Sequence, residues 1–181
     1  GFSDNFSFGV SYGIQNLIGD AKPSINKTTP EVQIKYRVFD ESEKMPALVY
    51  GLDTQGRGHY TDTLITPGDT LTLNRYDQKA WGMYMVMSKN WNLLGNLGLH
   101  AGISKSLSEN DDGDKDINVF IGIDKELNRS FSLLIEYDAA LNDNLSEGDY
   151  SLNEITFGKG KGYLNTGIRW AMSPNVMLEI N

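Results

Sequence analysis

The chain has 181 residues, a formal net charge of −8 and no cysteine. This length suits one domain, and the missing cysteines exclude disulfides and thiolate metal sites. The negative charge argues against a nucleic-acid binder, which would need a basic face. No window of the sequence approaches the ~18 consecutive apolar residues of a membrane helix, an argument that applies to helical spans alone.

The segment from Phe6 to Ile14 carries a large apolar residue at every second position, with serine or glycine between them. Successive residues of a β-strand point to opposite faces, so this pattern predicts a strand with one apolar face and one small, polar face. Eight further segments show a similar alternation, and we expect a strand in each of them: 31–38, 47–53, 81–87, 97–104, 117–124, 133–139, 164–170 and a last one that begins at Val176.

The fourth of these segments is ambiguous because both of its faces are apolar. We place its larger residues on the apolar side shared with the other strands: Trp81, Met83, Met85 and Met87.

The connections between the predicted strands are alternately long and short. The long ones cover 15–30, 54–79, 108–116 and 142–161, and the short ones cover 40–46, 89–94, 125–130 and 172–175. Antiparallel up-and-down strands bring all the long connections to one end of the sheet, as in outer-membrane barrels. Within 54–79 we also expect a small hairpin that turns at Pro67, Gly68 and Asp69.

These features together predict an all-β protein, an antiparallel up-and-down transmembrane β-barrel that forms a single domain over residues 1–181 in a bacterial outer membrane. Aromatic residues near the strand ends fit the two interfacial girdles of such barrels. About nine strands are visible, whereas bacterial single-chain barrels have even strand numbers, and an unpaired edge in lipid is costly. We therefore expect ten or more strands in the complete barrel, of which this chain is an excerpt or one piece.

Nine charged or ionisable residues are predicted to face the barrel interior: Lys35, Arg37, Asp53, His100, Asp124, Glu136, Asp138, Arg169 and Glu179. In a barrel of about ten strands side chains fill most of the interior, so we expect these groups to pair with one another. The alternative is a narrow polar path, in which rings of charge select ions or small solutes.

No catalytic motif stands out, and we expect neither enzymatic activity nor a cofactor. A serine hydrolase needs a nucleophile hydrogen-bonded to a histidine. Ser104 shares a face with His100 but stands about 13 Å away along the strand. A nucleophile on another strand is the remaining alternative. We favour a histidine that is hydrogen-bonded to polar groups of the interior.

Two loop segments have weak ligand-binding character. Asp112, Asp114 and Asp116 alternate as in the start of a calcium loop, yet the distal bidentate glutamate is missing, so we favour a solvated acidic loop over a weak Ca²⁺ site. The run G-K-G-K-G at 158–162 lacks the G-K-[S/T] of a phosphate-binding loop. Lys159 and Lys161 could contact lipopolysaccharide phosphates, but we favour a simple lead-in to the next strand.

Several strings occur together: F-G-V-S-Y-G, V-Q-I-K-Y-R-V-F-D-E-S, M-P-A-L-V-Y-G, G-D-K-D-I-N and G-K-G-K-G-Y-L-N-T-G-I-R-W. In these strings the chain resembles the YjbH-like outer-membrane barrel proteins and their uncharacterised relatives. The resemblance spans most of the chain and implies an outer-membrane location and, for some members, a role beside exopolysaccharide production or export. It carries over no site residue, because the strings are strand and turn patterns.

Three functions are compatible with these observations. The first is a non-enzymatic barrel that is a structural or assembly component of an envelope complex, with membrane lipid, lipopolysaccharide and other envelope proteins as partners. The second is a narrow, porin-like channel for ions or small solutes. The third is a soluble, lipocalin-like ligand-binding barrel, in which the apolar faces would point inward.

Overall fold

The computed structural model describes residues 5–16, 22–66, 69–143, 150–152, 155–157, 162–173 and 176–180. Their regular structure consists of antiparallel strands. Across these ranges no helix combines the length and the apolar character needed to cross a membrane.

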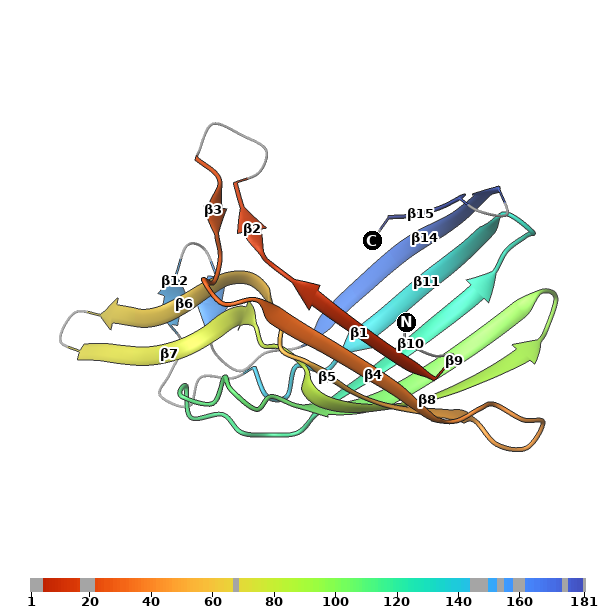
Figure 1. The fold of residues 1–181 in the computed structure, drawn as a ribbon, viewed down its shortest axis with the longest axis horizontal. Coiled ribbons are helices and arrows are strands. Elements are labelled where there is room, and N and C mark those ends of the chain that lie inside the picture. Colours follow the sequence, from red (N-terminus) through yellow and green to blue (C-terminus); the bar gives the residue numbers. More distant parts are fainter. Residues whose placement is uncertain are drawn as a thin grey trace.

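Nine strands form one sheet in which the order along the chain is also the order in space (Figure 1). Each of the eight neighbouring pairs is antiparallel. The nine strands predicted from alternation are thereby confirmed, with bounds that move by a few residues. They are β1 (Phe6–Ser11), β4 (Glu31–Phe39), β5 (Ala47–Asp53), β8 (Gly82–Asn92), β9 (Asn96–Lys105), β10 (Asn118–Glu126), β11 (Phe131–Asp138), β14 (Tyr163–Ser173) and β15 (Val176–Ile180).

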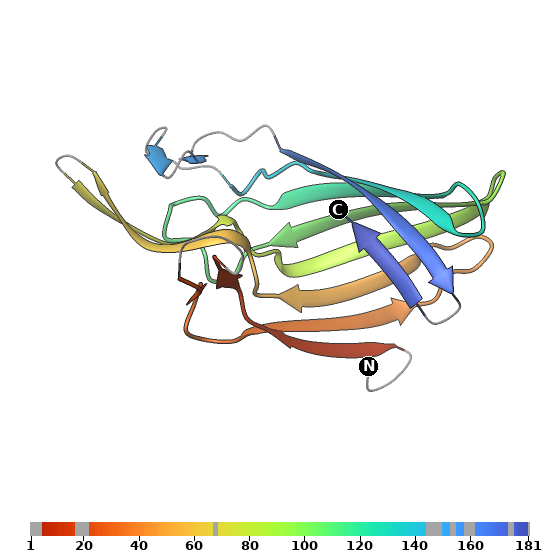
Figure 2. The same cartoon turned by 90° about the horizontal axis from the view of Figure 1, so that it is seen from above.

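The long connections lie together at one end of this sheet (Figures 1 and 2). They contain three two-stranded hairpins: β2 (Ile14–Gln15) with β3 (Ser24–Ile25), β6 (Arg57–Thr66) with β7 (Asp69–Gln78), and β12 (Tyr150–Leu152) with β13 (Ile155–Phe157). The pairing of β6 with β7 confirms the predicted hairpin, although Pro67 and Gly68 of its turn lie outside the described residues.

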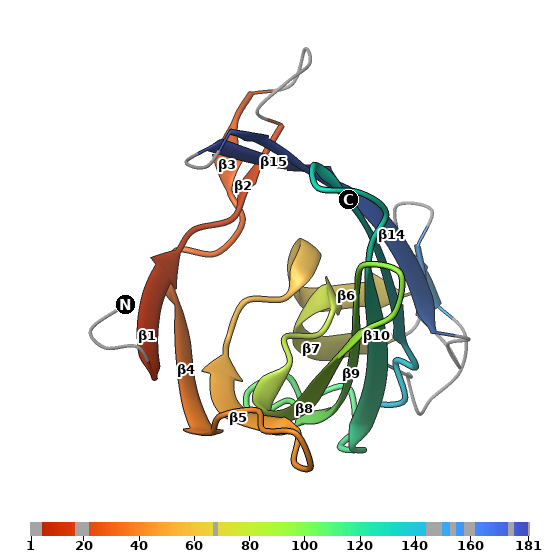
Figure 3. The same cartoon turned by 90° about the vertical axis from the view of Figure 1, so that its right-hand side faces the viewer.

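The sheet is strongly curved and open (Figure 3). β1 and β15 are its two edges, and in the described part of the chain neither pairs with a strand on its outer side. The antiparallel up-and-down arrangement is therefore present, whereas a closed barrel is not found among these residues.

The register separates a polar face from an apolar face across the whole sheet. One row of directly paired residues runs through Lys35, Gly51, Tyr84, Ser104 and Asn118. The other face carries large apolar residues that are largely solvent-exposed, of which Phe8, Met87, Ile121 and Ile168 are examples. Because residues of the first face line a groove in the sheet, the polar side is the concave one.

The position of Trp81 corrects the sequence-based interpretation. Met83, Met85 and Met87 are exposed on the apolar side as expected. The ring of Trp81 instead stacks on Phe120 of the polar face, with ring centroids 4.3 Å apart. The cause is Gly82, which has a φ of 63° and shares the partner Lys105 with Met83, so the alternation is interrupted between Trp81 and the strand.

The most buried residues lie at the end of the sheet that carries the long connections. The buried apolar side chains described there include Leu64 and Leu73 of the β6–β7 hairpin and Ala140 in the connection after β11. Buried charged side chains accompany them, among them Arg75 and Glu109. The centre of the sheet is thus a thin curved wall, and the packed part of the described molecule is its loop end.

Candidate functional site

The concave face holds a groove of about 700 Å³. Five of the nine residues predicted to face inward line it: His100, Asp124, Glu136, Arg169 and Glu179. Arg57 of the β6–β7 hairpin and the stacked Trp81 also contribute to its wall. The groove is the part of the described structure where the predicted inward residues gather.

Arg169 holds together three strands of the groove wall. Its Nη1 donates to Oδ2 of Asp124 at 3.0 Å, and its Nε donates to Oε2 of Glu179 at 2.8 Å. Asp124 lies on β10 and Glu179 on β15, so the guanidinium bridges strands on both sides of β14. These pairs are about one-third exposed, and we therefore ascribe to each only a modest share of the stability.

His100 is hydrogen-bonded to a serine of the neighbouring strand. Its Nδ1 lies 2.8 Å from Oγ of Ser88, which stands directly opposite on β8. Ser104 on the same strand as His100 faces Tyr84 and Asn118 instead. The contact gives one ring nitrogen of the imidazole a polar partner on the concave face.

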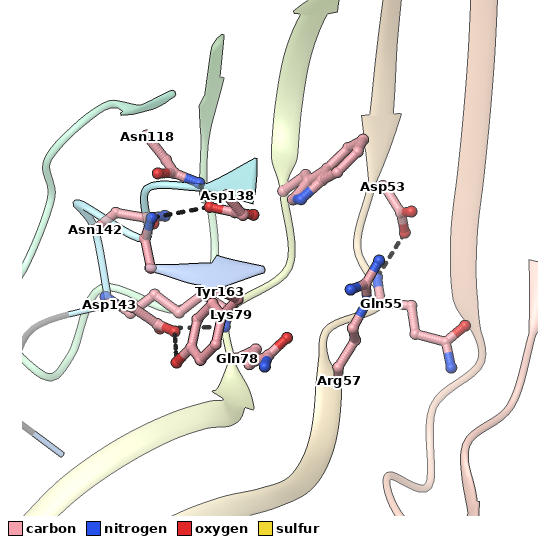
Figure 4. A pocket seen from close by; sticks show the side chains of 12 residues that line it. Asp53, Gln55, Arg57, Gln78, Lys79, Asn118, Asp138, Asn142, Asp143 and Tyr163 are labelled. Atoms are coloured by element: carbon pink, nitrogen blue, oxygen red, sulfur yellow. Dashed lines mark hydrogen bonds between the residues drawn. The ribbon is translucent and has the colours of Figure 1, made fainter. Parts of the chain in front are cut away.

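Asp53 and Asp138 line a second, smaller pocket of about 100 Å³ at the loop end of the groove (Figure 4). Asn118 donates to Oδ1 of Asp138 at 2.6 Å, and the backbone N–H of Gln55 donates to Oδ1 of Asp53 at 2.9 Å. Arg57 lines this pocket as well as the groove. The two spaces therefore adjoin at the base of the β6–β7 hairpin.

Lys35 and Arg37 lie on the polar face of β4 but outside the groove. Nη1 of Arg37 is 3.1 Å from Oδ1 of Asp40 in the following turn. Lys35 is exposed between the small residues Ser7 and Gly51, its direct neighbours on β1 and β5. The structure thus separates these two cations from the other predicted inward residues.

Five charged side chains form a buried group at the loop end, here called the loop-end ionic cluster: Arg75, Lys79, Glu109, Asp112 and Asp143. Of these five, only Asp112 was singled out from the sequence, as part of the candidate Ca²⁺ loop. Arg75 has no exposed side-chain surface and binds both Asp112, at 2.6 Å, and Asp143. Nζ of Lys79 lies 2.7 Å from Oδ2 of Asp112. The cluster therefore joins the β6–β7 hairpin to the connections before β10 and after β11.

Backbone and hydroxyl donors complete the cluster. Glu109 accepts from the backbone N–H of Tyr76 at 2.7 Å and of Ala80 at 2.5 Å. The hydroxyl of Tyr163 donates to Oδ2 of Asp143 at 2.9 Å. Burial raises the pKa of both Glu109 and Asp143 above the ordinary carboxyl values, against the opposing effect of the nearby cations and hydrogen bonds.

Two of the three alternating aspartates, Asp112 and Asp114, are buried, so the expectation of a solvated acidic loop is wrong for them. Asp112 is paired with Arg75 and Lys79, and Oδ1 of Asp114 accepts from the backbone N–H of Asp116 at 3.0 Å. Among the described residues, no group of three or more His, Cys, Asp or Glu residues is arranged to hold a metal ion. Lys159 and Lys161 of the glycine-rich run lie outside the described residues.

At the opposite end of the sheet, Glu41 in a short turn is bound to β8. It accepts from the side chain of Asn90 at 2.6 Å, from the backbone N–H of Asn90 at 2.9 Å and from Nζ of Lys89 at 2.9 Å. The hydrogen bonds from Asn90 and Lys89 lower the pKa of Glu41 to about 2. The carboxylate thus stays charged and bound well below the ordinary glutamate range.

We expect this turn to loosen on acidification. Because the folded pKa of Glu41 is depressed, its contribution to stability is present above the unfolded value of about 4.5 and is lost as the pH falls towards 2. The hydrogen-exchange rate of the Asn90 amide, corrected for the intrinsic pH dependence, should increase as the pH falls from 5 to 2. Glu41→Gln should remove the pH dependence, and a wild-type profile that stays flat from pH 5 to 2 would contradict the assignment.

No protein-family model, curated protein or solved structure matches the chain. The described molecule thus offers three features that bear on function: a curved sheet with an exposed apolar side, a charged groove and a buried ionic cluster at one end.

Proposed function

We propose that this protein forms the wall of a β-barrel in a bacterial outer membrane and acts there, without catalysis, as a structural or assembly component of a cell-envelope complex. The observation that carries the proposal is the exposed apolar side of the nine-stranded sheet. Large apolar residues on this side are about half exposed from one edge to the other: Phe8 is 48%, Met87 53%, Ile121 51% and Ile168 52% exposed.

An exposed apolar surface of this extent is unusual for a soluble monomer and is typical of a surface that meets lipid or a partner. Lipid also explains why charged side chains gather on the concave side, where Arg169 is paired with Asp124 and Glu179. A lipocalin-like barrel would have the opposite arrangement, with apolar residues around its interior. The distribution of side chains therefore favours a barrel wall in a membrane over a soluble, lipocalin-like barrel.

The loop-end ionic cluster favours a scaffold over an open pore. The base of the β6–β7 hairpin contributes Arg57, Gln78 and Lys79 to the small pocket that adjoins the groove. Lys79 and Arg75 are in turn fixed by Asp112 and Asp143. Ion pairs thus fix side chains that line this end of the concave space, which supports a restricted interior of the kind found in plugged barrels.

A narrow channel is the second candidate, and the charged groove is the observation that favours it. Asp124, Glu136 and Glu179 line a space of about 700 Å³ that is large enough for hydrated ions. The proposed link to surface polysaccharide is separate and comes only from the sequence resemblance. Deletion of the protein should alter surface polymer or complex integrity under the scaffold proposal, with unchanged permeability to small solutes.

Membrane extraction tests the proposal directly. We expect the protein to stay with the outer-membrane fraction during a carbonate wash, to dissolve only in detergent and to show a heat-dependent shift on a gel. Liposomes that contain the purified protein should not swell in sugar solutions, whereas discrete conductance steps would favour the channel. Release into the soluble fraction without detergent would overturn the membrane proposal.

A further inference from the structure

The two edges of the sheet are the starting point of the inference. In the described part of the chain, β1 has only β4 as a neighbour, and β15 has only β14. The apolar side continues to both edges: Val10 on β1 is 56% exposed, and Ile180 on β15 is 66% exposed. In lipid, the free N–H and C=O groups of such edges are costly, so an inserted sheet needs strands that cover them.

The strand directions determine how the edges can be covered. All eight neighbouring pairs are antiparallel, so β1 and β15, the first and the ninth strand in space, run in the same direction. A direct bond between β1 and β15 would be a parallel pair. Antiparallel pairing throughout requires an odd number of additional strands between them, and one is the smallest such number.

A second copy of this sheet does not meet the requirement in a membrane. A two-fold axis along the barrel would place β15 beside the β1 of the other copy, and these strands are again parallel. A two-fold axis across the barrel would make the edge pairs antiparallel, but it would put the long connections of the two copies on opposite sides of the membrane. Strands of a different sequence are therefore needed.

The chemistry beside β1 indicates what such a strand carries. The polar side of β1 has the small residues Ser7, Gly9 and Ser11. Their side chains are too short to block the path of the exposed Lys35 side chain from β4 across β1. No ion pair of Lys35 is present among the described residues. An acidic residue on the inward face of the next strand would lie within reach of its ammonium group.

We propose that an odd number of β-strands, from polypeptide other than the nine-stranded sheet, closes the gap between β1 and β15, with apolar residues outward and an acidic residue inward beside β1. This inference rests on the proposed membrane function.

Disulfide trapping in native outer membranes tests the closure, since the chain has no cysteine of its own. Met177→Cys is combined with Ser7→Cys, Gly9→Cys or Ser11→Cys in turn, all on the polar side of the two edges. The matched control is Ala171→Cys with Met177→Cys, which are direct partners on β14 and β15 and should be cross-linked by an oxidant. We expect the control to react and all edge pairs to remain open, with no disulfide-linked homodimer.

Hydrogen exchange of the same membranes supplies the positive evidence. We expect amides of β1 and β15 to exchange within about tenfold of those of β9, as they would in a closed barrel. Lys35→Glu should speed exchange in β1 about tenfold and leave β15 unchanged, whereas Lys35→Arg should behave as the wild type.

Each remaining outcome overturns the inference. An intramolecular disulfide between the edges would indicate direct closure, and a homodimer would indicate a second copy. Rapid exchange at β1 and β15 would indicate open edges. An unchanged exchange rate of the β1 amides in the Lys35→Glu variant would contradict an acidic partner of Lys35. If carbonate releases the protein from the membrane, the proposed function fails; if the protein stays in the membrane and the edges are open or cross-linked, only this inference fails.

Discussion

Replacing Arg75 with methionine is expected to lower the free energy of unfolding by about 3–5 kcal/mol, the usual cost of removing one partner from a buried ion pair. The side chains of Arg75 and Asp112 have no exposed surface, and that of Asp143 is 4% exposed. Methionine retains the length of the arginine stem but removes the ion pair of the buried Asp143 and leaves Asp112 with Lys79 as its cation. The measurement is urea unfolding of the protein in detergent, followed by the fluorescence of its three tryptophans.

Arg57→Met is the matched control for this prediction. Arg57 lies at the base of the same hairpin, but its side chain is 62% exposed and its contact with Glu136 is 4.0 Å long. We expect its loss to change the free energy of unfolding by less than about 1 kcal/mol. If Arg75→Met and Arg57→Met destabilise the protein equally, the loop-end ionic cluster does not have the role assigned to it.

The strands could be predicted from sequence because a two-residue period is a local property. Alternation from Phe6 onwards is readable in the chain itself, and it also indicates which residues share a face. Trp81 was placed on the wrong side because the period holds only within an unbroken strand. Gly82 adopts a positive φ and forms a β-bulge with Met83 opposite Lys105, and no periodic signal marks such a position.

The loop-end ionic cluster was missed for a different reason. Arg75 is separated from Asp112 by 37 residues and from Asp143 by 68, and all three lie in or next to the long connections. Their contacts arise because the up-and-down topology brings these connections to one end of the sheet. The gathering could have been anticipated from that topology, but the pairing of particular side chains depends on loop conformations that spacing does not encode.

The open sheet agrees with the odd number of strands that the sequence predicts. The sequence yields an odd number of alternating segments, and the described structure has nine strands with two free edges. What the structure adds is direction: β1 and β15 are parallel to each other, so the gap cannot be closed by a simple antiparallel bond between them. Antiparallel pairing throughout therefore requires an odd number of additional strands between β1 and β15.

Replacing Ile168 with arginine is expected to destabilise the membrane-inserted protein by about 2–4 kcal/mol, the cost of a cation on the lipid side near the middle of a barrel strand. Ile168 lies in the central part of β14, opposite Leu133 and Ile180, and is 52% exposed. In a soluble protein the same change at an exposed position would cost less than about 0.5 kcal/mol. Unfolding in lipid vesicles, compared with the wild type, measures the difference.

The control for this prediction lies on the same strand and faces the other way. Asn165 is on the polar side of β14, where its amide donates to Oε1 of Glu136 at 3.4 Å. Asn165→Arg puts the same charge beside a carboxylate in the groove, so we expect a change of less than about 1 kcal/mol. Because the two variants differ only in the face that receives the cation, a large effect of Ile168→Arg alone identifies the apolar side as the lipid side. If both variants retain wild-type stability, the apolar side faces water, and the membrane proposal fails with it.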